Sequence, residues 1–210
     1  MPAHRKSEKG NAILEFSIVI LVLIPVLFGT IGFGVNLGNM LQSAQITRDV
    51  AHIYARGIDF SQPQNQNLAV NLVQGLGGMT INSGNGVLIL SQIREVYLAD
   101  CTAAGLTSAQ CANQGKRVFQ NRIVIGQSSL RSSNFGTPAS ALVSANGNIS
   151  SNNYMTQSGA VASNFDDALL PQQDGDVAYV VEAYFATPNL SFLGSWQANA
   201  TGGSYTRAIF

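Results

Sequence analysis

The chain has 210 residues, 11 of them basic and 11 acidic, and 46% are hydrophobic while only 10% are charged. About 25% charged residues is usual for a soluble globular domain. Such sparse and balanced charge argues against a nucleic-acid-binding protein, which needs a surplus of Lys and Arg to contact phosphates. It also argues against intrinsic disorder, which combines low hydrophobicity with high net charge. The length suits one domain plus an additional apolar segment.

The first element in chain order is an apolar run near the N-terminus. Residues 16–35 contain no charged side chain, and twenty helical residues extend about 30 Å, the thickness of the hydrocarbon core of a bilayer. We therefore predict a membrane-spanning helix over residues 13–35. The basic residues nearest to this run are Arg5, Lys6 and Lys9 before it and Arg48 after it. The positive-inside rule then places Met1 in the cytoplasm and the bulk of the chain outside.

A carboxylate, Glu15, stands at the start of this run. An ionised group at a membrane helix is costly and marks a candidate functional residue. If the chain were cut after Gly10, Asn11 would carry a new ammonium group four positions before Glu15. An i, i+4 spacing brings two side chains together on a helix, and the same charge pair can form between neighbouring subunits. Cleavage would thus supply the cation that Glu15 lacks.

Two other interpretations of the apolar run stay open. A cleaved secretory signal has a shorter apolar region and an A-x-A-like site, for which only residues 32–34 offer small side chains at suitable positions. A plain uncleaved signal anchor would need neither Gly10 nor Glu15.

The stretch Gly10-Asn-Ala-Ile-Leu-Glu15-Phe16 resembles the processing signal of type IV pilins. Together with Leu-Ile-Pro-Val-Leu-Phe-Gly at residues 23–29 and Ile-Gly-Phe-Gly at residues 31–34, it is similar to the TadE-like family of pseudopilins (minor pilins) from tight-adherence pilus systems, also called Tad/Flp or type IVc systems. The resemblance covers about residues 10–56.

This resemblance implies a pilin-like α+β fold, with a long N-terminal helix packed on a small antiparallel sheet. It implies that residues 1–10 are a leader, which a prepilin peptidase removes between Gly10 and Asn11 on the cytoplasmic side. Glu15 and Phe16 would then set the register of the helix in the assembly. The implied protein is a structural component of pilus assembly and adhesion in the bacterial inner membrane. Its partners would be other pilin and pseudopilin subunits and the membrane assembly platform, and no nucleic acid and no cofactor are expected.

The apolar run contains a proline and several glycines. Pro25 removes one backbone donor and clashes with the carbonyl of residue 21, which predicts a kink that helps the helix adjust during packing. Gly34 and Gly38 form a small-xxx-small pair at which another helix can approach closely. The alternative for both features is the general tolerance of membrane helices for proline and glycine.

Beyond the membrane segment, residues 36–58 show apolar positions at steps of three and four, which predicts an amphipathic extension of the same helix. One stripe is Leu37, Leu41, Ala44, Arg48, Ala51, Ala55 and Ile58, and an adjacent stripe is Met40, Ile46, Val50 and Ile53. Gly57 is expected to end the helix. The predicted long helix therefore covers residues 11–58.

Residues 59–210 are predicted to form an extracytoplasmic α+β domain. Leucines spaced by four predict a helix over residues 67–76. Apolar or alternating segments predict strands over residues 87–99, 117–125, 176–186 and 205–210. The segment 128–163 is rich in Ser, Asn and Gly, and we interpret it as a long polar loop insert, flexible or facing a partner.

The chain has only two cysteines, Cys101 and Cys111, between two predicted strands. Outside the cytoplasm such a pair favours a disulfide, and zinc is disfavoured because no His or carboxylate cluster accompanies the thiols. Asp174 and Asp176 are weak candidates for a calcium site, with turn formation before a strand as the preferred alternative.

An enzyme is not expected. His4 lies in the predicted leader and His52 lies on the long helix, so neither suits a catalytic triad in the globular part. The sequence contains no G-x-S-x-G, H-E-x-x-H or P-loop motif. The contrasting function is an anchored extracytoplasmic binding module unrelated to pili.

Overall fold

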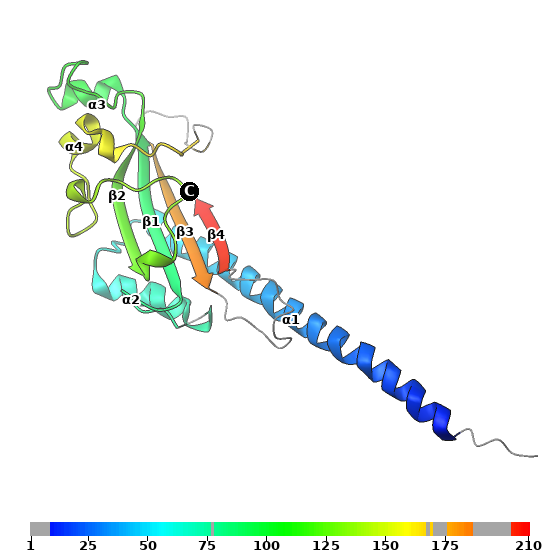
Figure 1. Ribbon diagram of the computed structural model, residues 1–210. Helices are drawn as coiled ribbons and strands as arrows, with labels where there is room; N and C mark the ends of the chain where they lie inside the picture. Colours follow the sequence, from blue (N-terminus) through cyan, green and yellow to red (C-terminus); the bar gives the residue numbers. More distant parts are fainter. Residues whose placement is uncertain (1–8, 77, 167–168, 170–175, 187–202) are drawn as a thin grey trace, which may run out of the picture.

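The fold consists of one long helix that carries a small antiparallel sheet on its C-terminal part (Figure 1). A computed structural model describes residues 9–76, 78–166, 169, 176–186 and 203–210. The elements are α1 (Lys9–Ala55), α2 (Pro63–Leu72), β1 (Gly86–Glu95), α3 (Leu98–Ala103), β2 (Arg117–Gly126), α4 (Ser151–Thr156), β3 (Val177–Ala186) and β4 (Gly203–Ile209), with short 3-10 turns between them. The expected α+β layout of a long N-terminal helix and a small antiparallel sheet is confirmed.

α1 ends at the glycine that the sequence indicates. Gly57 has a φ of 87°, a left-handed conformation that favours glycine. Its N–H donates to the carbonyl of Tyr54 (3.0 Å), and the N–H of Ile58 donates to the carbonyl of Ile53 (3.3 Å). These two bonds satisfy carbonyls at the helix terminus in a Schellman motif. The conformation of Gly57 and these two backbone hydrogen bonds therefore end the helix where the globular domain begins.

The C-terminal third of α1 packs against the sheet, chiefly against β3 and β4. The buried face consists of Ser43, Ile46, Thr47, Val50, Ala51 and Tyr54. It includes Ile46 and Val50 from the second predicted stripe, whereas Leu37, Leu41 and Arg48 from the first stripe are exposed. Ala51 of the first stripe is buried as well, and small hydroxyl and Ala side chains let α1 approach the strands closely. Periodicity in hydrophobicity does not detect such positions.

The sheet has the order β2-β1-β3-β4 with every neighbouring pair antiparallel. Side chains alternate between two faces, so Leu88 and Leu90 of β1 point to the same side as Val181 and Ala183 of β3. This face packs with α1 and α2 into the larger hydrophobic cluster. The four predicted strands are present, although β4 begins at Gly203, two residues before the predicted start.

The second helix differs from its prediction in position. α2 begins at Pro63, whose fixed φ suits the first turn of a helix, and ends at Leu72, followed by a 3-10 turn over Gln74–Leu76. Leu68 and Leu72 are exposed, and the helix buries Ala69 and Val70 instead. The leucine spacing thus indicates a helix, but the residues of α2 that contact the core are Ala69 and Val70.

The first predicted strand is shorter than expected. β1 ends at Glu95, and the chain turns into α3. The Asp100 carboxylate accepts a hydrogen bond from the backbone N–H of Tyr97 (2.9 Å) and pairs with Arg94 (2.7 Å), which fixes the start of this helix. Ion pairing across the turn overrides the apolar pattern that predicted a strand up to residue 99.

The polar segment 128–163 is folded rather than a set of free loops. It contains α4 and three 3-10 turns, and it contributes Phe135, Ile149, Tyr154 and Met155 to a second hydrophobic cluster. Its backbone also pairs with β2, since the N–H of Arg122 donates to the carbonyl of Gly147 (2.8 Å). The segment is largely irregular, as expected for a polar loop insert, and a few apolar residues among many polar ones attach it to the sheet.

Candidate functional site

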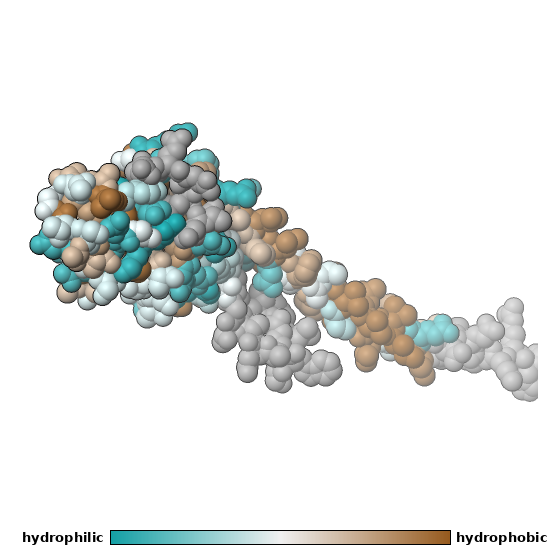
Figure 2. Space-filling view, turned by 90° about the horizontal axis from the view of Figure 1, so that it is seen from above, coloured by the Kyte–Doolittle hydropathy of each residue, from teal (hydrophilic) through white to brown (hydrophobic). Residues whose placement is uncertain are grey.

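The exposed apolar half of α1 is the most unusual surface of the described chain. Residues 12–42 extend about 46 Å at 1.5 Å per residue, and their large apolar side chains are exposed except that of Ile20, which is half-buried. Figure 2 shows this half as a projecting apolar rod beside a mixed, largely hydrophilic head. In the described part of the chain, α1 is the one helix long and apolar enough to cross a membrane, and none of its most apolar window is buried. The structure thus offers one candidate for a single-pass anchor.

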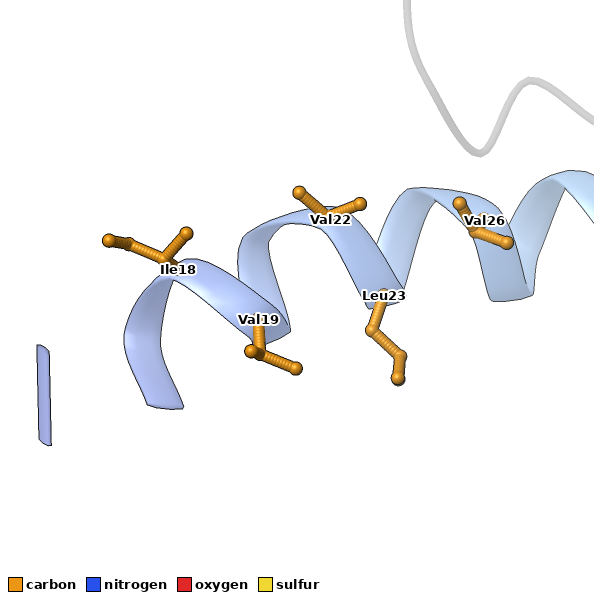
Figure 3. A pocket seen from close by; sticks show the side chains of 5 residues that line it. All are labelled: Ile18, Val19, Val22, Leu23 and Val26. Carbon is orange, nitrogen blue, oxygen red and sulfur yellow. The ribbon is translucent and has the colours of Figure 1, made fainter. Parts of the chain in front are cut away.

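A shallow open hollow on this half is lined by Ile18, Val19, Val22, Leu23 and Val26 (Figure 3). All five side chains are aliphatic, and they come from successive turns of one helix. No polar group among them could orient a substrate. The hollow is therefore suited to packing against lipid chains or another apolar helix rather than to chemistry.

The polar side chains within the apolar half are satisfied locally. Ser17 Oγ donates to the carbonyl of Ile13 (2.8 Å), and Thr30 Oγ1 donates to the carbonyl of Leu27 (2.8 Å). In lipid no water is present to form hydrogen bonds with these hydroxyls. A hydrogen bond to a carbonyl of the preceding helical turn removes most of the free-energy cost of placing them there. Both residues are compatible with a membrane environment.

The structure places the predicted processing and register residues on one helix. α1 begins at Lys9, so Gly10 and Asn11 lie in its first turn, and residues 1–8 of the predicted leader lie outside the described residues. Glu15 and Phe16 are exposed on the same helix. The backbone thus gives Asn11 and Glu15 the expected i, i+4 relationship.

The predicted kink and packing residues also lie on α1. The helix continues through Pro25 from Lys9 to Ala55, so the single chain has no break at this proline. A Cβ atom added at Gly34 or at Gly38 would meet no other atom within 4 Å. Both glycines therefore face open space, as a surface for close helix approach requires.

A buried polar cluster on the opposite face of the sheet escaped the sequence analysis. Glu182 of β3 accepts hydrogen bonds from the hydroxyl of Ser133, from the N–H of Asn134 (2.9 Å) and from the hydroxyl of Tyr205 (2.7 Å). Burial, followed by the hydrogen bond to Glu182, raises the pKa of Tyr205. A lone Glu within the apolar strand Val-Val-Glu-Ala-Tyr-Phe was the signal that could have revealed this site.

Arg122 of β2 is a cationic member of this cluster. Its Nη2 donates to the carbonyl of Gly136 (2.7 Å), and its guanidinium lies 4.5 Å from the centre of the Phe119 ring. Burial lowers the pKa of Arg122 to about 10, and the charge of Glu182 opposes this shift. Arg122 and Glu182 both hold the segment around residues 133–136 against the sheet, so we assign the cluster a structural role.

The remaining predicted positions are in the globular part. Cys101 and Cys111 form a disulfide with a Cα–Cα distance of 6.0 Å, which confirms the predicted pair and connects α3 to the turn before β2. Asp176 is half-buried just before β3, whereas Asp174 lies outside the described residues. Among the described residues, no group of three or more potential metal-ligating side chains is found.

Comparisons of the chain with protein families, with curated proteins and with solved structures return no match. Functional conclusions therefore rest on the residues and the geometry of the chain itself.

Proposed function

We propose that this protein is a structural pseudopilin, or minor pilin, of a Tad-type pilus assembly system. The observation that carries the proposal is the division of α1 into an exposed apolar half with Glu15 near its start and a C-terminal third that packs on a small four-stranded sheet. Soluble monomeric domains rarely expose an apolar surface as large as that of this projecting helix. A subunit that is stored in a membrane and then transferred into a fibre needs one.

In the proposed mechanism, the bacterial inner membrane holds the subunit by residues 13–35, with the N-terminus in the cytoplasm and the sheet outside. A prepilin peptidase cuts between Gly10 and Asn11. The new ammonium group of Asn11 then pairs with Glu15 of its own or a neighbouring chain. Apolar helices gain little hydrophobic free energy when they leave lipid for each other, so close packing and this charge pair set the register with the partner subunits.

The second candidate is an uncleaved, signal-anchored binding module. The same exposed apolar helix supports it, because an anchor of this length needs no further chemistry. The two candidates differ in what they require of Gly10 and Glu15. A pseudopilin needs both residues, and a simple anchor needs neither.

The experiment compares Glu15→Ala with Ser17→Ala, a matched control in the same part of the helix. For a pseudopilin we expect both variants to enter the membrane, Glu15→Ala to lose pilus assembly and Ser17→Ala to keep it. N-terminal sequencing of membrane-extracted protein should begin at Asn11 in cells with an active prepilin peptidase. Normal assembly by Glu15→Ala, together with an intact leader, would replace the pilus function with the anchored module.

A further inference from the structure

We propose that two copies of this chain form a parallel, two-fold dimer through one face of α1 outside the bilayer. The face consists of Leu41, Gln45, Arg48 and Asp49, and we term it the back face. The proposal rests on the proposed function only in that α1 spans a bilayer. It adds a contact between subunits that is separate from the one made by Asn11 and Glu15.

The back face lies on the side of α1 that points away from the sheet. Ser43 and Thr47 are buried and contact β4. Successive helical residues are about 100° apart, so Gln45 lies about 160° around the helix from each of them. All four side chains of the back face are exposed. The face ends below His52, whose ring lies 4.1 Å from that of Phe210.

A second helix can therefore approach the back face without meeting the sheet. Figure 1 shows the sheet on one side of the C-terminal part of α1. Two copies that meet through their back faces would carry their sheets on opposite outer sides. The two globular parts thus do not compete for space in such a dimer.

Two opposite charges flank the centre of the back face. Arg48 lies about 60° to one side of Gln45 and Asp49 lies about 40° to the other side. Neighbouring residues on a helix do not face each other, so these two side chains cannot pair within one chain. Neither side chain has an ion-pair or hydrogen-bond partner in the described part of the chain. Both charges are thus available to a partner.

A second copy supplies the complementary charges by symmetry. A two-fold axis parallel to α1 and beside Gln45 places the Arg48 side of each helix opposite the Asp49 side of the other. Two Arg48–Asp49 pairs then form, as charged residues flanking the seam of a parallel coiled coil do. The back face is therefore complementary to itself.

The membrane selects this arrangement. Both copies insert in the same direction, so their α1 helices are parallel, as this two-fold axis requires. Arg48 and Asp49 differ in height by only about 1.5 Å, so they pair when the two helices are level. A shift of two helical turns, about 11 Å, would separate them.

The charge pairs supply orientation rather than most of the affinity. An exposed ion pair contributes little free energy, because water and salt screen it. Close packing of the two apolar halves in lipid supplies the rest. The level dimer is thus a form of the subunit stored in the membrane, and a subunit that enters a staggered assembly must first break its Arg48–Asp49 pairs.

Cysteine cross-linking of the full chain in phosphatidylcholine vesicles tests the dimer. The two native cysteines are joined in a disulfide, so a single free cysteine can be introduced. Gln45→Cys places the thiols of the two copies beside the two-fold axis and should give a disulfide-linked dimer upon oxidation. Met40→Cys is the matched control, because Met40 is 56% exposed and lies about 140° around the helix from Gln45. We expect at least a fivefold higher dimer yield for Gln45→Cys, and equal yields would overturn the proposal.

Charge reversal in the Gln45→Cys chain tests the pairing itself. Arg48→Glu leaves only carboxylates facing each other, so the dimer yield should fall at least threefold. Arg48→Glu combined with Asp49→Arg exchanges the two charges and should restore the yield. Lys116→Glu, an exposed residue before β2, changes the net charge equally and should have no effect. Lack of restoration in the double reversal, or an equal loss in Lys116→Glu, would reject the Arg48–Asp49 pairs.

Alkaline extraction of the same vesicles separates this proposal from the proposed function. Chain that stays in the membrane but gives no Gln45→Cys dimer rejects the back-face contact alone. Chain that is released by alkali removes the membrane anchor on which both proposals depend.

Discussion

The hydroxyl oxygens of Thr47 on α1 and Thr206 on β4 lie 2.5 Å apart, and the hydroxyl of Ser43 lies 3.1 Å from that of Thr206. These residues join the long helix to the edge strand of the sheet. The contact is polar although it borders the larger hydrophobic cluster. Short hydroxyl side chains allow the helix and the strand to approach closely. Hydrogen bonds between these hydroxyls satisfy their polar groups where water is excluded.

Replacement of Thr47 should weaken this contact moderately. Thr47→Val keeps the shape and removes the hydroxyl, so we expect the free energy of unfolding to fall by about 1 kcal/mol. Thr30→Val is the control, because its hydroxyl bonds only within the exposed half of α1. Urea unfolding of the detergent-solubilised chain, followed by near-UV circular dichroism, measures both. Equal effects of the two substitutions would contradict a special role for the helix–strand contact.

Glu182→Gln should destabilise the sheet domain strongly for a substitution of nearly the same size. The carboxylate accepts three hydrogen bonds in a buried site, and an amide group would place a donor against one of these donors. We expect a loss of about 2 kcal/mol in the same unfolding experiment. Glu95→Gln, which loses only a partly exposed ion pair with Arg117, should cost less than about 1 kcal/mol.

Stability should fall above pH 10 because of buried phenols. Burial is the largest cause of the raised pKa of Tyr54, so the folded state keeps its proton where the unfolded state, with a pKa near 10, loses it. The stabilisation is complete below pH 10 and is lost as the pH rises further. Arg122, with a pKa of about 10, acts in the opposite direction. Urea midpoints at pH 9 and pH 11 should therefore differ less in Tyr54→Phe than in the unchanged protein.

Loss of the disulfide should destabilise the turn region without changing the fold. The bond between Cys101 and Cys111 has a sequence separation of 10, and closing such a loop contributes about 2.8 kcal/mol in the chain-entropy model. Reduction should lower the free energy of unfolding by about this amount. A double variant, Cys101→Ser with Cys111→Ser, should show the lower stability and no response to reductant. Free thiols in oxidised, folded protein would contradict the assignment.

Gly38→Leu should separate folding from assembly. Space around Gly38 is open, so the substitution should leave unfolding of the sheet domain unchanged to within about 0.5 kcal/mol. A leucine would nevertheless keep a second helix from close approach, and we expect pilus assembly to fall. Gly57→Leu is the contrasting substitution, because its φ of 87° makes it destabilise the chain itself. Unchanged assembly by Gly38→Leu would exclude this face from the interface.

The sequence by itself determined the features that depend on neighbouring residues. The length and apolar character of α1, its end before Gly57, the four strand segments and the disulfide pair follow from composition, local periodicity and spacing. These signals are local, so no knowledge of distant segments was needed. The placement of Gly10, Asn11 and Glu15 on one helix belongs to the same class.

Only the tertiary structure decided which residues face the core and where polar groups are buried. Ser43 and Thr47 lie on the docking face of α1 because β4, more than 150 positions later in the sequence, supplies Thr206. Glu182 tolerates burial because distant residues donate hydrogen bonds to it. Hydrophobic periodicity describes one segment at a time. Close packing and hydrogen-bond satisfaction belong to pairs of segments, which only the folded chain brings together.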